Sequence, residues 1–175
     1  MIRHAIAEDR DGFRQRTGLD DSRRPLTEAG AAKMKRAARG LKQVAGPILL
    51  FATSPYTRAG ATASIVVEHA GFPDPVEVQA LQPDQHPSKF LEWLNSELGS
   101  NAAFTDADME KATFAAVGHE PHLSRVIGWS LTGRDAPLGE LRKGGACLLM
   151  FSGKFSASSA TVEWILKADH LRRLA

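Results

Sequence analysis

The chain begins Met1-Ile2-Arg3-His4-Ala5, in which two apolar residues are followed at once by an arginine and a histidine. We interpret this stretch as the end of a short β-strand that delivers two polar side chains to the edge of a sheet. An Arg-His pair also occurs by chance, so the opening is informative only together with the stretches that follow it.

Three later stretches also contain an arginine or a histidine, near a turn-forming proline or glycine. They are Arg24-Pro25-Leu26-Thr27-Glu28-Ala29-Gly30, Ser54-Pro55-Tyr56-Thr57-Arg58-Ala59 and Val117-Gly118-His119-Glu120-Pro121. The second and third, like Arg3-His4, follow the carboxyl end of a predicted strand. Ligands of open α/β sheets bind at that edge, so we expect these residues to converge on one site.

The hydrophobic pattern predicts an α/β fold. Residues 48–52 and 113–117 are continuous apolar runs, as expected for parallel strands buried on both faces. Helical periodicity follows each of them, and Thr27 is suited to cap another helix. Residues 146–151 and 161–166 read as a closing hairpin. The alternation predicts one domain over residues 1–175, a doubly wound three-layer sandwich with a mostly parallel sheet.

Three segments have weaker patterns. Residues 7–24 are polar and charged, and we interpret them as a loop beside the site. Residues 76–81 have the alternation of a strand. Residues 99–111 are polar without any period, and we expect a mobile connection there.

Composition narrows the function classes. The chain has 43% hydrophobic and 24% charged residues, which is typical of a globular protein. A net charge of +2 does not indicate a nucleic-acid partner. No apolar run is long enough to span a bilayer, and no signal peptide is evident, so we expect no membrane partner. The single cysteine, Cys147, excludes an internal disulfide and fits a cytoplasmic location.

In their order and spacing, the four stretches resemble the histidine phosphatase superfamily, and within it the short, cap-less SixA-type phosphohistidine phosphatases. The resemblance runs from Ile2 to about Phe151. It implies a phosphatase that works through a phosphohistidine intermediate. His4 is then the nucleophile, Arg3 and Arg58 hold the phosphoryl oxygens, and His119 donates to the transferring group.

The residue types suit that chemistry. A neutral imidazole is a nucleophile toward phosphorus when its other nitrogen is held by a hydrogen bond. Arginine offers forked donors that match phosphoryl oxygens, and its charge lowers the pKa of a neighbouring histidine. We expect neither metal nor cofactor, because His119 and His122 are three residues apart rather than the four of the zinc protease motif.

Three features depart from the superfamily pattern. Only Met1 and Ile2 precede Arg3-His4, where family members usually have several apolar residues. Ala5 stands where the Arg-His-Gly triplet has glycine, although alanine is common in the SixA-like branch.

A larger departure is the general acid, for which the comparable loop, residues 81–87, offers only Asp84 or His86 outside any clear motif. We assign Asp84, with Arg24, to a substrate-binding role.

These observations predict a metal-independent phosphatase whose substrate is phosphohistidine on a protein. A phosphatase for small phosphate esters is an alternative of the same class. A weakly catalytic module that only binds phosphorylated partners is an alternative of another class, since binding and turnover need nearly the same residues.

Overall fold

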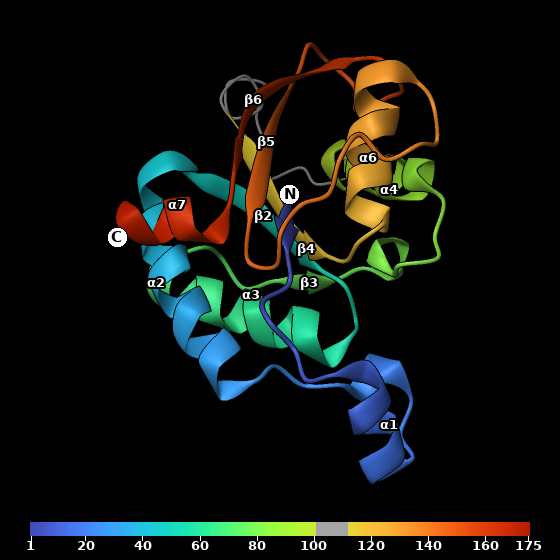
Figure 1. Ribbon diagram of the computed structural model, residues 1–175. Helices are drawn as coiled ribbons and strands as arrows, with labels where there is room; N and C mark the ends of the chain where they lie inside the picture. The colour runs from blue at the N-terminus through green and yellow to red at the C-terminus, as the bar shows by residue number, and fades with distance from the viewer. Residues whose placement is uncertain (101–111) are drawn as a thin grey trace.

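The computed structural model describes residues 1–100 and 112–175, and most of the predicted connection 99–111 therefore lies outside the described residues. Its strands form one sheet in the order β3-β2-β4-β1-β5-β6 (Figure 1). The strands are β1 (Ile2–Arg3), β2 (Ile48–Thr53), β3 (Val76–Glu77), β4 (Thr113–Gly118), β5 (Ala146–Phe151) and β6 (Ala160–Leu166). β1 to β4 are parallel, whereas β5 and β6 run antiparallel to their neighbours. The predicted mostly parallel sheet is confirmed.

Helices cover both faces of this sheet, which confirms the three layers. One layer holds α2 (Glu28–Val44), α3 (Thr57–Ala70) and α7 (Ala168–Arg173), and the other holds α4 (Pro87–Ser100) and α6 (His122–Thr132). The other helical segments of the described residues are α1 (Arg10–Thr17), η1 (Asp21–Arg23) and η2 (Gln79–Leu81).

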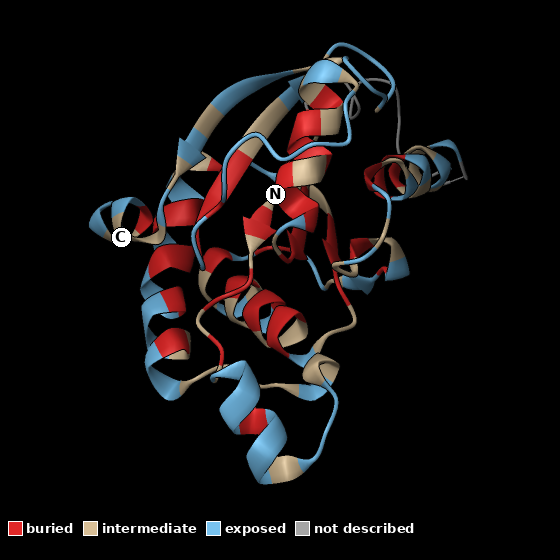
Figure 2. Ribbon diagram, turned by 45° about the vertical axis from the view of Figure 1, so that its right-hand side comes forward, coloured by how far each residue is buried: buried red, intermediate tan, exposed pale blue. Residues whose placement is uncertain are grey.

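The central strands are buried because successive side chains enter opposite layers. Phe51 packs into the core under α2 and α3, while its neighbour Ala52 packs into the core under α4 and α6. Ala115 and Ala116 of β4 divide between the same two cores. Figure 2 shows the buried residues on the inner sides of these helices. Burial on both faces explains why these strands read as continuous apolar runs.

Helix α2 begins as its sequence predicts and packs tightly at its far end. The Thr27 hydroxyl accepts a hydrogen bond from the N–H of Gly30 at 2.9 Å, which satisfies one free donor of the first turn. Gly40 lies against α7 so closely that a Cβ there would come within 1.8 Å of the Leu171 carbonyl oxygen. Only glycine permits this contact between α2 and the C-terminal helix.

Two of the weaker expectations are wrong. Residues 7–24 contain α1, which is capped by Asp9 at its start and by Gly18, in the left-handed conformation, at its end. Phe13 is the only buried residue of α1, so the segment lacks the apolar stripe that predicts a helix. The strand expected at residues 76–81 ends at Glu77, and η2 takes up its second half.

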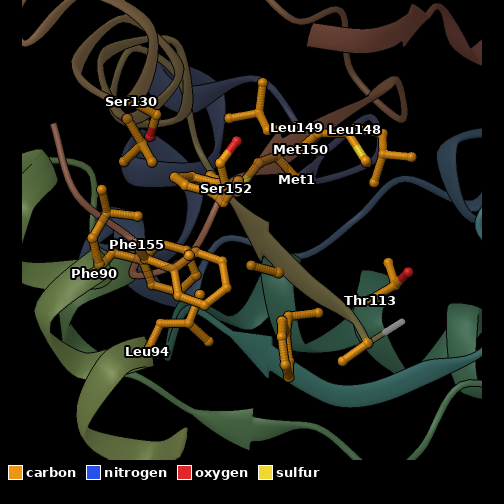
Figure 3. Close-up of a pocket in the computed structure, with 17 residues that line it drawn as sticks. Met1, Phe90, Leu94, Thr113, Ser130, Leu148, Leu149, Met150, Ser152 and Phe155 are labelled. Carbon is orange, nitrogen blue, oxygen red and sulfur yellow. The ribbon is translucent and has the colours of Figure 1, made fainter. Parts of the chain in front are cut away.

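The shortness of β1 leaves a gap within the sheet. Ile2 pairs with Val117 of β4 and with Ala146 of β5. The other ends of β4 and β5, residues 113–115 and 148–151, have no pairing with β1. An apolar pocket of about 610 Å³ opens there (Figure 3). Its walls include Phe90, Leu94, Leu149 and Phe155, and none of its lining residues carries a charged side chain or belongs to the predicted site. No described helix is both long and apolar enough to cross a membrane.

Candidate active site

The ends of β1, β2 and β4 bring the three sequence motifs together. The His4 N–H donates to the Gly118 carbonyl at 3.0 Å, and the Ser54 N–H donates to the Val117 carbonyl at 3.0 Å. These bonds continue the parallel ladders just beyond the strands, so the side chains of His4, Arg58 and His119 meet at one edge of the sheet. All three residues are buried.

The hydrogen bonds of His4 define its tautomer. Its Nδ1 lies 2.7 Å from the carbonyl oxygen of Ala5, which can only accept, so Nδ1 carries the proton. Its Nε2 accepts from the Nε–H of Arg58 at 3.3 Å. The lone pair of His4 therefore sits on Nε2, beside a guanidinium.

The surroundings of His4 keep its ring neutral. Burial is the main cause that lowers its pKa from 6.5 to about 3. The hydrogen bond to Ala5 opposes this, and the charges of Arg58, Arg3 and Arg24 lower the pKa further. The arginine charges thus lower the pKa of His4 as expected, but desolvation, which the sequence did not indicate, contributes more.

Asp21 anchors two of the predicted arginines, and sequence reasoning missed it. Its backbone carbonyl and its carboxylate accept from Arg58 at 2.7 and 3.1 Å, and the carboxylate also accepts from the Nε of Arg24 at 2.7 Å. Arg24 further donates to the Glu8 carbonyl at 2.6 Å. One carboxylate thus holds both guanidinium groups beside His4. Its position three residues before Arg24 is a local signal that was available.

Arg3 is held from a different part of the chain. Its Nη1 donates to the carboxylate of Glu140 and to the carbonyl of Leu141, both at 2.6 Å. The Arg3 side chain is 14% exposed and Glu140 is 54% exposed. The ion pair therefore joins a nearly buried guanidinium to a carboxylate at the surface.

His119 packs beside His4 and Tyr56. Its ring centroid lies 5.0 Å from that of His4 and 4.9 Å from that of Tyr56, and Arg58 lies over the same Tyr56 ring. Its Nε2 lies 2.8 Å from the Ser54 hydroxyl, while its Nδ1 is buried without a partner among the described residues. Burial lowers its pKa to about 2, with further lowering by the charges of His4 and Arg58.

Ser54 also accepts a hydrogen bond from the Tyr56 N–H at 3.4 Å, so its own hydrogen is free to point at Nε2 of His119. In that arrangement Nδ1 of His119 carries the proton and is an unused donor. Ser54 was not among the predicted site residues, although it opens one of the quoted motifs.

The predicted acid, Asp84, lies at the periphery. It is exposed in the loop after η2, and its charge raises the pKa of Tyr56, although burial contributes more to that rise. Neither Asp84 nor His86 hydrogen bonds to His4 or His119 among the described residues. His122, which is fully buried with both ring nitrogens unpartnered there, has its pKa lowered to about 4, mainly by burial.

No cluster of three metal-ligating side chains occurs in the part of the chain that the structure describes. The groups around His4 include two guanidinium groups held by the Asp21 carboxylate and the neutral imidazole of His119, and guanidinium groups are suited to bind phosphoryl oxygens.

Comparison with known proteins gives a consistent picture of the fold. Residues 1–82 match the model of the histidine phosphatase superfamily, branch 1. No curated protein matches the chain. Among solved structures, the protein histidine phosphatase SixA complexed with tungstate superposes with a TM-score of 0.74 and 19% identity, over 97% of this chain and 96% of that one.

Two further neighbours act on small esters, by name. A mycobacterial glucosyl-3-phosphoglycerate phosphatase, complexed with VO3, superposes with a TM-score of 0.70 and 15% identity, over 95% of this chain and 97% of that one. A mutant phosphoserine phosphatase from Entamoeba histolytica, in complex with phosphoserine, gives 0.60 and 15%, over 97% and 96%. At these identities the likeness shows the shared fold.

Proposed function

We propose that this chain, a member of the histidine phosphatase superfamily by the match of its first 82 residues and by its fold, removes phosphate from phosphohistidine on a protein. The observation that carries the proposal is the state of His4. A neutral imidazole, protonated on Nδ1 and with its lone pair on Nε2, accepts a hydrogen bond from Arg58 that a bound phosphoryl group would replace. This is the state that a nucleophile toward phosphorus requires.

In the first step, Nε2 of His4 attacks phosphorus, and the bond from phosphorus to the leaving nitrogen breaks. Arg3 and Arg58 hold the phosphoryl oxygens, Arg24 adds positive charge, and Nδ1 of His119 donates to a phosphoryl oxygen. In the second step, water attacks the phosphorus on His4, the P–Nε2 bond breaks, and inorganic phosphate leaves. Positioning and electrostatic stabilisation supply the catalysis, so we propose that no metal is needed.

The choice of phosphohistidine follows from the leaving group. The leaving nitrogen departs as neutral imidazole once its other ring nitrogen is protonated, which solvent can accomplish. An alkyl ester needs an acid in the transition state, a contribution typically worth about 10²–10⁴ in rate. The carboxylate nearest the reacting groups, Asp21, is engaged by Arg58 and Arg24, and Asp84 is exposed. The site therefore favours P–N over alkyl P–O bonds.

The elements that surround the site favour a protein as the substrate. Between Arg58 and Gly118, the described residues belong to α3, β3, η2, α4 and β4, which are parts of the sandwich itself. Among the described residues, no separate domain covers this edge of the sheet, which supports a protein as the substrate.

A labelling experiment tests the nucleophile. Brief incubation of the native protein with a ³²P-labelled phosphohistidine peptide should leave acid-labile label on the protein, and His4→Ala should lose both label and turnover. Acid-stable label, or full activity of His4→Ala, refutes the assignment. Binding without repeated turnover would instead support a module that only recognises phosphorylated partners.

Hydrolysis of small phosphate esters is the second candidate, and it is favoured by the charge of Asp84, which is close enough to Tyr56 to help raise the pKa of that side chain. The discriminating measurement is kcat/KM for a phosphohistidine peptide, an aryl phosphate and an alkyl phosphate, for the native protein and for Asp84→Asn. If the alkyl ester matches the peptide and Asp84→Asn selectively abolishes its hydrolysis, Asp84 is the acid and the small-ester function is correct.

A further inference from the structure

Residues 140–145, which we call the strap, hold Arg3 by both its backbone and its side chain. The Arg3 N–H donates to the Gly145 carbonyl at 3.0 Å, and the Gly144 N–H donates to the Arg3 carbonyl at 3.1 Å. The side chain donates from Nη1 to Glu140 and to the Leu141 carbonyl, as described above. The strap joins α6 to β5, so Arg3 depends on a segment far away in sequence.

The strap determines which donors of Arg3 remain for a ligand. A guanidinium has five N–H donors, and the two on Nη1 are both taken by the strap. The Nε–H is buried and has no partner among the described residues. Nε and Nη2 share one edge of the planar group, and this edge binds two oxygens of an anion side by side. Holding Nη1 therefore leaves the bidentate edge of Arg3 for a phosphoryl group.

Glu120 fixes the strap at the residue that contacts Arg3. Its Oε1 accepts a hydrogen bond from the Leu141 N–H at 3.1 Å, and its Oε2 accepts one from the Ser124 hydroxyl. The Leu141 N–H thus points to Glu120 while its carbonyl receives Nη1 of Arg3. The Leu141 side chain is also buried, against Leu123 and Ile127 of α6.

We propose that Glu120 is a positioning residue for Arg3, which it orients through Leu141 so that the Nε/Nη2 edge faces the phosphoryl group of the substrate. The choice of ligand rests on the proposed function. Glu120 follows His119 directly, so one short stretch supplies a histidine beside His4 and, through its next residue, orients Arg3. Glu140 adds a second, exposed anchor to the same nitrogen.

A purely structural role of Glu120 makes a different prediction. A carboxylate that only stabilises the start of α6 through Ser124 would change the free energy of unfolding and leave anion binding intact. Glu120→Ala should instead weaken vanadate binding about 10- to 100-fold, the range that follows from misplacing one positioned group. Glu120→Gln keeps an oxygen acceptor for Leu141 and should stay within about threefold of the native protein. Ser124→Ala, the matched control, should change stability without changing vanadate affinity.

A double-mutant cycle provides the test, with vanadate affinity measured by calorimetry. In an Arg3→Ala background, Glu120→Ala should have no further effect, because the residue through which it acts is gone. Equal weakening in both backgrounds, or none in the native background, overturns the proposal.

A ligand-free readout separates this proposal from the proposed function. In the native protein the Nε–H of Arg3 should give a single dispersed ¹⁵N resonance, identified by its loss in Arg3→Ala. The resonance should collapse toward the free-arginine position in Glu120→Ala and persist in Glu120→Gln. An unchanged resonance in folded Glu120→Ala refutes the positioning role, even if no phosphorylated substrate is turned over. Failure to turn over substrate with the expected resonances refutes only the proposed function.

Discussion

Acidification should destabilise this protein strongly between pH 7.5 and 5.0, because three histidines are buried as neutral rings. The pKa values of His4, His119 and His122 are lowered from 6.5 to about 3, 2 and 4, in each case mainly by burial. Below pH 6.5 the unfolded chain binds protons at these rings and the folded chain does not. Stability is therefore lost as the pH falls from 6.5 toward the folded-state values.

The size of this loss of stability follows from the difference between the pH and the pKa of histidine in the unfolded chain. At pH 5.0, each ring lies about 1.5 pH units below its unfolded pKa, which corresponds to about 2 kcal/mol. Three rings together give a loss of about 6 kcal/mol, comparable to the whole stability of many domains. Burial also lowers the pKa of the Met1 amine, which adds to the loss with the same sign.

Urea unfolding followed by tryptophan fluorescence at pH 7.5, 6.5, 5.5 and 5.0 measures the effect. His122→Leu removes one titrating ring and should lower the pH-dependent loss by about 2 kcal/mol. Val126→Ala, in the same helix, is the control, because a cavity there should lower stability equally at every pH. A loss below about 2 kcal/mol in the native protein would show that these rings take up protons in the folded state, and would refute the reasoning.

Three further predictions concern the site. Arg58→Ala should lower kcat/KM for an aryl phosphate by about 10²–10³, the cost of one preorganised donor, and Arg58→Lys should restore little because lysine lacks the fork; a loss below tenfold would contradict a role for Arg58 in binding the phosphoryl group. Asp21→Asn should strengthen inhibition by inorganic phosphate roughly tenfold, since an internal anion is removed, while kcat falls as Arg58 and Arg24 lose their anchor; an unchanged inhibition constant would argue against this. Activity should survive exhaustive chelation and be inhibited by vanadate, and restoration of a chelated enzyme by added metal would show that the site is misassigned.

The sequence predicted the parts of the fold that local pattern determines. The apolar runs of β2 and β4, the Thr27 cap and the closing hairpin all stand where their residues indicate. Helix α1 was not predicted, because a helix that buries only Phe13 has no periodic apolar face. The local signals of this helix are its capping residues, Asp9 and Gly18. Aspartate and glycine are equally common in turns, so they do not indicate a helix by themselves.

The candidate site also contains residues that the sequence indicated and residues that it did not. The structure brings His4, Arg58 and His119 together, as expected of residues that follow the ends of neighbouring strands. Their catalytic roles come from the family resemblance and stay predictions. Glu140 and Leu141 were not found, because their contact with Arg3 spans 137 and 138 residues and leaves no local trace. Nor can spacing alone show that the Asp21 carboxylate lies between two guanidinium groups rather than in solvent. Such partners are fixed by tertiary structure.

The pairing of the site arginines with Asp21 and Glu140 lowers the net positive charge of the candidate active site. Three guanidinium groups, those of Arg3, Arg24 and Arg58, face two carboxylates, and the histidines between them are neutral. The two carboxylates therefore offset about two of these three positive charges. The exposed Arg10 and Arg142 also pair with Asp21 and Glu140, at 3.5 and 3.9 Å, but solvent and salt screen their charges. Small monovalent anions gain little by entering such a site, and its long-range field is weak at physiological ionic strength. Phosphoryl recognition here rests on short-range geometry, so substrate capture should depend only weakly on salt.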